Sequence, residues 1–353
     1  MQACLVRFGT HEPFGHAAGE MAFHYQLAVS KECVRLNTLE AGHVYEQVQA
    51  DPVASQTLST PTNPPHSNER QMLSIDAAKV LTSTGEWRDV KTLTIADVAA
   101  NGRTHTNSYF SRLSECSLFA QQCQVEVRRR QLKRSRQVCA VNDGADWIPE
   151  VVTACRPDAV RILDFYHAAE HLAEAARTVF GEGTPGFGAW FATQRRELRD
   201  GDPDHVLEAL AELALAHPQH AVCINATQGY LLKRRNLIRY GEFKAAAWPI
   251  GSGAGEAAHK VVIQVRMKRA GMRWRTDNVD SMAAMRNLVC NQRWHSDWPV
   301  ITAARIRARS TRPMSQSSPS APKSSSLPPG FKLTQRTPWR HQPVGAARLR
   351  PSL

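Results

Sequence analysis

Two short apolar runs in the middle of the chain are each followed by a helical pattern. The runs cover residues 138–141 and 159–163, and their β-branched content predicts strands. Each run leads into an aspartate, Asp143 or Asp164, before the helical pattern begins. The connection between the runs is long enough for a parallel crossover. We therefore expect both aspartates at the carboxyl edge of one sheet, where α/β proteins build their sites.

Upstream patterns predict three more strands and a helix. They lie at residues 72–76, 87–95 and 104–112 for the strands and 115–134 for the helix. Three antiparallel strands, a helix, a parallel strand, a helix and another strand is the order of the ribonuclease-H-like fold, a mixed α/β sheet. Such a fold sets the first strand beside the fourth, which brings Asp76 next to Asp143.

A glycine-rich stretch precedes another predicted helix and supplies a third carboxylate, Glu256. The glycines are Gly251, Gly253 and Gly255, and the helix has an apolar stripe of Ala258, Val261, Val262 and Val265. At a helical period, Glu256 points away from this stripe and shares its face with Lys260 and Met267. The glycines permit close approach of another backbone or of a nucleic acid.

The N-terminal part is predicted to be helical. Residues 17–25 and 31–47 have helical patterns, with Ser30 as N-cap of the second, whereas residues 1–16 show no clear period. A short helix, a turn and a longer helix outline a helix-turn-helix, and equally an ordinary helical hairpin. Gly42 interrupts the second pattern.

Composition shifts divide the chain into segments. Residues 51–70 are polar, contain four prolines and are predicted to be a linker. The expected organisation is a helix-turn-helix-like DNA-binding remnant at 1–50, the linker, a catalytic domain at 71–298 with a helical insertion at about 173–247, and a basic, Ser/Pro-rich disordered tail at 299–353.

Composition favours a cytoplasmic protein. The 353 residues are 42% hydrophobic, enough for a core, and the eight cysteines form no C-x-x-C pair. No apolar run approaches the roughly 18 residues of a membrane span. We expect no membrane partner.

The net charge of +12 is unevenly distributed. Ten positive charges and no acidic residue follow Asp297. The densest basic run elsewhere lies at residues 128–136. On a helix it would form a phosphate-facing surface, or simply a solvated charged face.

Three carboxylates from separate elements suit a divalent cation. Mg²⁺ prefers oxygen ligands and retains several waters, so a few carboxylates make a typical site. Two ions roughly 3.5–4 Å apart can activate an attacking oxygen and stabilise the leaving oxygen of a phosphodiester. Asp76 would bridge both ions, Asp143 would hold one and Glu256 the other.

The motifs together resemble bacterial insertion-sequence transposases of the DDE type, closest to the ISKra family within the Mutator-like, ribonuclease-H-like superfamily. The resemblance is carried by SIDAAKV, GEWRDVKTLTI, NDGADWI, RILDFYHAAEHL and the long block YLLKRRNLIRYGEFKAAAWPIGSGAGEAAHKVVIQVRMKRAGMRWRTDNVDSMAAMRNLVCNQRW. It runs from about residue 17 to 294.

The resemblance implies an enzyme that cleaves and transfers DNA strands. Its catalytic and metal-ligating triad falls on Asp76, Asp143 and Glu256, with two Mg²⁺ ions or Mn²⁺ as cofactor. Its partners are DNA, in the form of terminal inverted repeats and target, and further copies of itself on that DNA, in a nucleoid-associated cytoplasmic location. The residues expected to contact DNA are Arg128, Arg129, Arg130, Lys133, Arg134, Lys260, Arg266, Lys268 and Arg269.

This sequence departs from the family pattern in three places. Ala77 stands where a glycine is expected, family members carry a longer N-terminal region, and the tail from residue 299 resembles nothing in the family. These departures are compatible with a truncated or decayed copy of such a transposase. The alternative function is that of a catalytically inactive DNA-binding remnant.

Asp164 and His167 form a second motif. They resemble an Asp/Cys-x-x-His element of Mutator-like relatives, which makes them candidate accessory residues, or else Asp164 is an ordinary N-cap. The same segment spells His167-Ala-Ala-Glu170-His171, the H-x-x-E-H pattern of a zinc hydrolase with Glu256 as a distal ligand. That alternative leaves Asp76 and Asp143 unexplained.

Overall fold

A computed structural model describes residues 1–58 and 69–310 of the protein. Residues Met1–Ser310 form one compact unit of mixed α/β structure. Its strands are β1 (Arg70–Leu81), β2 (Trp87–Val98), β3 (Thr104–Arg112), β4 (Gln137–Asn142) and β5 (Val160–Leu163). Among the described residues, no helix has both the length and the apolar character needed to cross a membrane.

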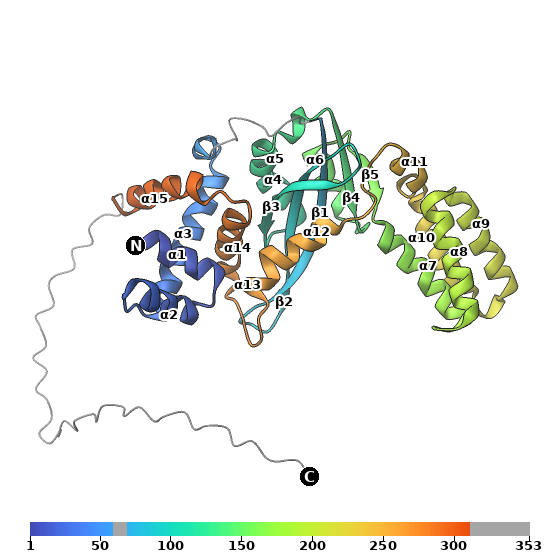
Figure 1. Ribbon diagram of the computed structural model, residues 1–353, viewed down its shortest axis with the longest axis horizontal. Coiled ribbons are helices and arrows are strands. Elements are labelled where there is room, and N and C mark those ends of the chain that lie inside the picture. The colour runs from blue at the N-terminus through green and yellow to red at the C-terminus, as the bar shows by residue number, and fades with distance from the viewer. Residues whose placement is uncertain (59–68, 311–353) are drawn as a thin grey trace, which may run out of the picture. The chain divides into compact units, whose positions relative to one another are not determined.

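The five strands form one mixed sheet in the order β3-β2-β1-β4-β5 (Figure 1). Strands β1, β2 and β3 are antiparallel neighbours, whereas β4 is parallel to both β1 and β5. The first strand therefore lies beside the fourth, as the element order predicts. Strand β1 continues beyond the predicted end at Asp76 because it forms a long hairpin with β2, whose turn includes Gly85 at φ +88°.

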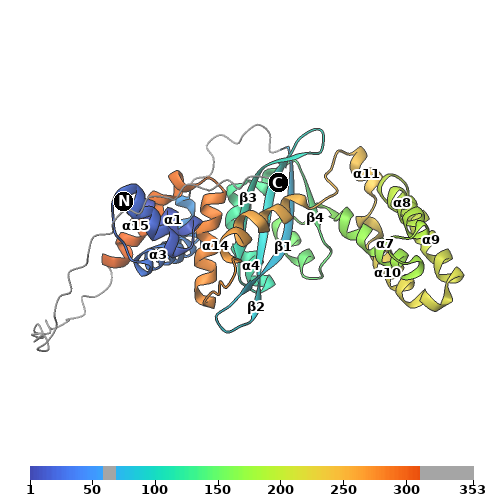
Figure 2. The same ribbon diagram turned by 60° about the horizontal axis from the view of Figure 1, so that its bottom comes forward.

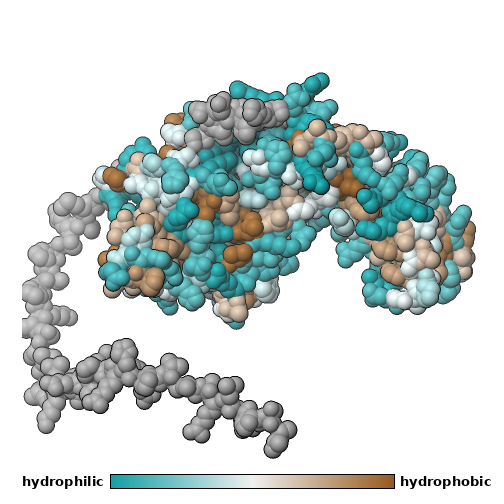
Figure 3. Space-filling view, in the orientation of Figure 1, coloured by the Kyte–Doolittle hydropathy of each residue, from teal (hydrophilic) through white to brown (hydrophobic). Residues whose placement is uncertain are grey.

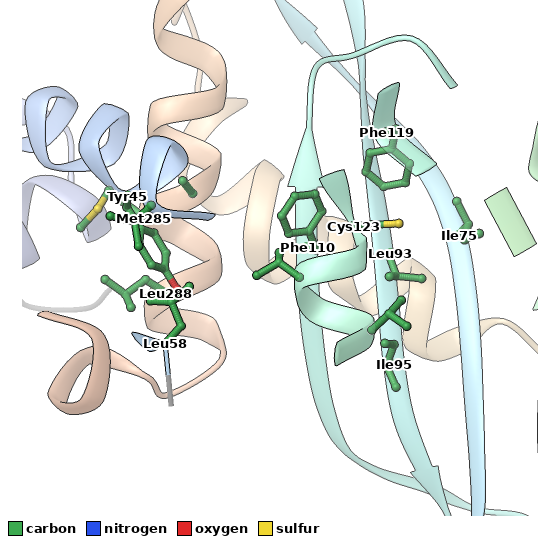
Figure 4. Packing of buried hydrophobic residues seen from close by; sticks show 14 of the residues in the cluster. Tyr45, Leu58, Ile75, Leu93, Ile95, Phe110, Phe119, Cys123, Met285 and Leu288 are labelled. Carbon is green, nitrogen blue, oxygen red and sulfur yellow. The ribbon is translucent and has the colours of Figure 1, made fainter. Parts of the chain in front are cut away.

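One face of the sheet is covered by short helices. Ile75, Leu93 and Phe110 of β1, β2 and β3 lie on the face of the sheet that packs against Phe119 and Cys123 (Figure 4). The covering helices are α4 (Cys116–Gln122), α5 (Gln124–Arg129) and α6 (Ile148–Cys155). The single helix predicted at 115–134 is wrong, because the backbone bends at Cys123 and a 3₁₀ turn follows at Leu132–Arg134.

The predicted insertion is a helical arm. It consists of α7 (Phe165–Phe180), α8 (Pro185–Asp200), α9 (Pro203–Ala216), α10 (Ala221–Lys233) and α11 (Tyr240–Ala245) (Figure 2). Prolines open α8 and α9, and the side chains of Thr184 and Asp202 cap them. The arm's apolar residues join the core on the second face of the sheet, where Phe165, Ala168 and Leu172 are buried.

Three helices form the N-terminal part: α1 (Gln2–His11), α2 (Phe14–Tyr25) and α3 (Lys31–Ala50). The Ser30 hydroxyl accepts a hydrogen bond from Cys33 N at 3.0 Å, which confirms the predicted N-cap. Helix α1 was missed because its short run buries small and polar residues, Gly9 and Thr10, beside Leu5 and Val6. Helix α3 packs on α14 (Thr276–Cys290), so the N-terminal helices share the compact unit of the sheet.

Gly42 does not interrupt α3. A Cβ added there would lie 2.1 Å from the Ser281 carbonyl oxygen of α14, so glycine is what lets the two helices approach. We expect Gly42→Ala to destabilise the protein by about 1–3 kcal/mol through overpacking. Urea unfolding followed by circular dichroism measures the change.

The matched control is Gly19→Ala in α2, where an added Cβ meets no atom within 4 Å. That change is expected to leave stability unaltered or to raise it by up to about 1 kcal/mol. Equal effects of the two substitutions would contradict the close-packing explanation.

The predicted tail begins too early. Residues 299–310 belong to helix α15 (Trp294–Ser310), which encloses Pro299 and buries Ile301. Buried Arg305 pairs with Glu40 of α3 at 2.6 Å. This ion pair and the burial of Ile301 together hold the segment on the N-terminal helices. The remainder of the predicted disordered tail, 311–353, and most of the predicted linker, 59–68, lie outside the described residues.

Candidate active site

Asp76 and Asp143 lie at the point where β1 and β4 diverge. Strand alternation puts Asp76 on the face of Met72 and Ala78, and it puts Asp143 on the face of Val141, which belongs to the same core cluster as Met72. The paired register of the two strands ends at Leu73 and Ala140, three residues before Asp76 and Asp143 respectively. The proximity continues past the ladder, because the side chain of Asn142 accepts a hydrogen bond from Ile75 N at 2.7 Å.

The Asp76 carboxylate is partly exposed and already in contact with the protein. Its side chain is 39% exposed, and one oxygen accepts a hydrogen bond from Ala77 N at 2.6 Å. The other oxygen lies 3.1 Å from Nε2 of His259. The His259 ring is buried, and this contact is an ion pair by distance without hydrogen-bond geometry.

Glu256 lies in α12 (Gly253–Ala258), which crosses the same face of the sheet over β1 and β2 (Figure 1). Gly255 allows the crossing, because a Cβ there would lie 2.6 Å from the Ser74 hydroxyl. The Glu256 carboxylate is exposed and pairs with Lys260 at 2.8 Å. It makes no contact with either aspartate; instead His259, one turn later, reaches Asp76.

The helix carrying Glu256 continues with a π-helical segment, His259–Gln264, before α13 (Val265–Met267). The predicted apolar stripe is correct for Ala258 and Val262 and wrong for Val261 and Val265, which are exposed. Met267, predicted on the Glu256 face, is buried. The wider π turn shifts the buried positions by a residue. Figure 3 shows that scattered hydrophobic patches interrupt the mainly hydrophilic surface of the protein.

The carboxylates do not form a ready ligand set for a metal. Within residues 1–58 and 69–310, no group of three or more His, Cys, Asp or Glu side chains is arranged to hold an ion. The two aspartates supply oxygen donors from neighbouring strands, and oxygen is the donor that Mg²⁺ prefers. Glu256 would have to leave Lys260 to join them.

Helix α10 of the arm holds the loop that follows Asp143. Gly144 has φ +83°, and the Tyr230 hydroxyl donates to the Asp143 carbonyl at 3.3 Å. Arg234 donates to the Gly144 carbonyl at 3.0 Å and lies 3.7 Å from Asp146. Burial raises the pKa of Tyr230, so its hydroxyl stays a donor at neutral pH. The arm thus fixes the backbone beside a candidate catalytic residue.

Asp164 acts as the N-cap of α7. One of its oxygens accepts a hydrogen bond from His167 N at 2.9 Å, and the other accepts one from Ser252 N in the glycine-rich stretch. This buried carboxylate therefore ties the start of the arm to the segment that leads into α12. Its structural role is established by these contacts, and its accessory catalytic role stays a prediction.

His167 and His171 are neighbours on α7, with ring centroids 5.0 Å apart. His171 stacks on Tyr230 at 3.9 Å, and burial, together with nearby His167, lowers the pKa of His171. A lowered pKa is expected both for a histidine that binds a metal and for a histidine ring that is only buried. The described residues nevertheless offer these histidines no third ligand, which the zinc-hydrolase alternative requires.

Three of the predicted DNA-contacting cations are not on the surface. Arg129 is buried and pairs with Asp297 at 2.6 Å, and Arg130 is largely buried beside Asp97 at 2.7 Å. Arg266 is buried as well. The prediction that these three side chains lie on an exposed DNA-binding surface is wrong, because α5 and α13 turn them into the protein.

The other predicted DNA contacts remain accessible to different degrees. The exposed ones are Arg128, Lys133, Arg134, Lys260 and Lys268. Arg269 is half-buried and pairs with Glu12 at 3.1 Å.

The sequence interpretation missed His259, Tyr230 and Arg234. A signal for His259 exists in the Glu256-x-x-His259 spacing, which puts both side chains on neighbouring turns. Tyr230 and Arg234 carry no such signal, because their importance depends on the arm folding back on the sheet. No protein-family model and no curated protein matches this chain.

Proposed function

We propose that the protein is a DDE-type transposase that cleaves and transfers DNA strands at the ends of an insertion sequence. The observation that carries the proposal is that Asp76 lies in β1, three residues beyond the last residue paired with β4, and Asp143 follows the end of β4 on the same face of the sheet. The strand order and the helical arm before Glu256 agree with a ribonuclease-H-like core of this class. The family resemblance of the motifs supplies the reaction.

In this proposal Asp76 and Asp143 hold Mg²⁺ or Mn²⁺, two ions in the complete site, and Glu256 joins them when DNA binds. When bound, such ions polarise the phosphodiester and favour ionisation of the attacking hydroxyl. The protein's own residues position the three carboxylates. His259 contacts Asp76, Tyr230 and Arg234 hold the Asp143 loop, and the exposed Glu256–Lys260 pair is weak enough to exchange for a phosphate contact.

The test is strand cleavage of labelled DNA carrying terminal inverted repeats, with Mg²⁺ or Mn²⁺ supplied. Cleavage that disappears without a divalent ion supports the proposal. The second candidate is a DNA-binding remnant, favoured by the separation of Glu256 from the two aspartates. Specific binding without any nicking of the repeats would select the remnant.

The DNA partner places the protein on the nucleoid in the cytoplasm, acting as a homo-oligomer. On the α5 side of the protein, Arg128, Lys133 and Arg134 line one shallow pocket that has no acidic residue in its lining. We refer to these three residues as the α5 basic surface. It replaces the basic run predicted at residues 128–136 as the surface that we propose to contact DNA.

Replacing all three residues of the α5 basic surface by alanine is expected to weaken DNA binding. If each one neutralises a phosphate, the slope of log K against log salt falls by roughly 0.9 per residue. Fluorescence anisotropy with a duplex at several salt concentrations measures this slope. An unchanged slope, with the fold intact by circular dichroism, would remove this surface from the DNA interface.

A further inference from the structure

A second cavity lies between the N-terminal helices and the segment before α14. Its volume is about 480 Å³, within the usual range for small-molecule sites. Five cationic side chains line it and no carboxylate does: Lys31, Arg35, Arg266, Arg273 and Arg275. None of the residues of the candidate active site contributes to this lining, so the cavity is a separate feature of the protein.

One wall of the cavity is aromatic and rigid. The Trp274 backbone pairs with the end of the β1–β2 hairpin, donating to Leu81 O at 3.0 Å and accepting from Ser83 N at 2.8 Å. Its indole donates to Met267 O at 3.2 Å, and Phe14 meets it edge to face at 6.2 Å. The wall is therefore already formed before any ligand binds.

Buried Arg266 gives the cavity an excess of positive charge. Its guanidinium donates to the Gly9 carbonyl at 3.1 and 3.2 Å and lies over the rings of Phe14 and Trp274. No ion pair joins it to a carboxylate in the described part of the chain. Burial, reinforced by Arg269 and Arg286, lowers the pKa of Arg266 to about 10. Burying a cation without a counter-charge is costly, and an anion in the cavity would offset that cost.

The rim has cations that are free to bind. Arg273 and Lys31 are exposed and form no ion pair within residues 1–58 and 69–310. Arg275 pairs with Asp277 in an exposed contact, which contributes little, whereas half-buried Arg35 donates to both carboxylate oxygens of Glu32.

We propose that this cavity binds a nucleotide, with the base against the partly exposed ring of Phe14, which packs on buried Trp274, and the phosphate at the cationic rim. An inorganic anion would leave the apolar wall uncovered, and an uncharged aromatic ligand would leave the cations unneutralised. A nucleotide satisfies both parts of the lining. The nucleotide comes either from solution or from a DNA strand, and only the second source rests on the proposed function.

The experiment compares three probes on the full chain by isothermal titration calorimetry: AMP, inorganic phosphate and a short single-stranded oligothymidylate. Wild type is expected to bind AMP at least about tenfold more tightly than phosphate, from stacking of one base. Arg273→Ala and Lys31→Ala are each expected to weaken AMP binding by about tenfold, the loss of a charge-assisted hydrogen bond. Phe14→Leu is expected to reduce the preference of AMP over phosphate.

Arg103→Ala is the matched control, because it removes an exposed cation that does not line the cavity. AMP binding that is unaffected by Arg273→Ala and Lys31→Ala, or that is no tighter than phosphate binding, overturns the proposal. Tighter binding of the oligonucleotide identifies a DNA strand as the source, and tighter binding of AMP identifies the free nucleotide. Asp143→Asn should leave AMP binding unchanged, so failure of the cleavage proposal and failure of this one are distinguishable.

Discussion

Asp143→Asn is expected to remove divalent-ion-dependent strand cleavage while the protein still binds DNA. The substitution keeps the size of the side chain and removes the charge that would hold an ion at the end of β4. We expect a loss of roughly 10²–10³-fold or more, the size found when a charge-stabilising group leaves an active site. Asp76→Asn is expected to have the same effect, since the proposal gives both carboxylates the same role of holding the ions. Cleavage of end-labelled terminal-repeat DNA, with binding measured on the same preparations, tests this.

Asp146→Asn is the matched control for Asp143→Asn. Asp146 lies three residues further along the same loop, its side chain is fully exposed, and it faces only Arg234 at 3.7 Å. Cleavage should survive this change. If Asp143→Asn and Asp76→Asn cleave as well as wild type, the two aspartates have no catalytic role.

Glu256→Gln separates two states of the site. The proposal requires this carboxylate to leave Lys260 and join the aspartates when DNA binds, so cleavage should again be lost. A fully active Glu256→Gln protein would mean that the third ligand comes from elsewhere.

Asp297→Ala is expected to lower the free energy of unfolding by about 3–5 kcal/mol, because it removes one partner of a buried ion pair. Asp297 is fully buried in α15 and accepts hydrogen bonds from both terminal nitrogens of Arg129, at 2.6 and 3.0 Å. The Tyr45 hydroxyl donates to the same carboxylate at 2.6 Å. Burial, with the adjacent Asp297 charge, raises the pKa of Tyr45, so this donor stays protonated. One carboxylate thus joins α3, α5 and α15.

Asp277→Ala is the control for Asp297→Ala. Its ion pair with Arg275 has both side chains largely exposed at 3.8 Å, so its removal should change stability by less than about 1 kcal/mol. Urea unfolding followed by tryptophan fluorescence and by circular dichroism measures both variants. Asp297→Asn keeps the shape of the side chain and two of its acceptor sites. An unaltered urea midpoint in both Asp297 variants would contradict the proposed structural role of the Asp297 ion pair.

Local patterns predicted most of the sheet. The strand at 104–112 coincides with β3, and the aspartate at the end of each apolar run lies at the sheet edge. The position of β1 beside β4 followed from element order alone. These features depend on short-range periodicity and on chain connectivity, which a single sequence displays directly.

The errors concern contacts between elements distant in sequence. Arg129 belongs to a basic run, yet Asp297 takes it into the core from far along the chain. The π-helical segment at His259–Gln264 shifted the buried face of the Glu256 helix, and no residue pattern announces such a turn. Gly42 was interpreted as a break because its partner, Ser281, lies in another helix.

The Asp164 hydrogen bonds at the base of the arm have a consequence for how the sequence of this protein can evolve. The arm leaves the sheet at Phe165 and returns at Ile250, and these two residues are hydrogen-bonded through their backbones at 2.9 Å, beside the Asp164–Ser252 contact. The first and last residues of the arm are therefore held together at one place. Lineages can lengthen, shorten or replace the outer turns of this excursion while the stem, and the edge where the two aspartates lie, keeps its geometry.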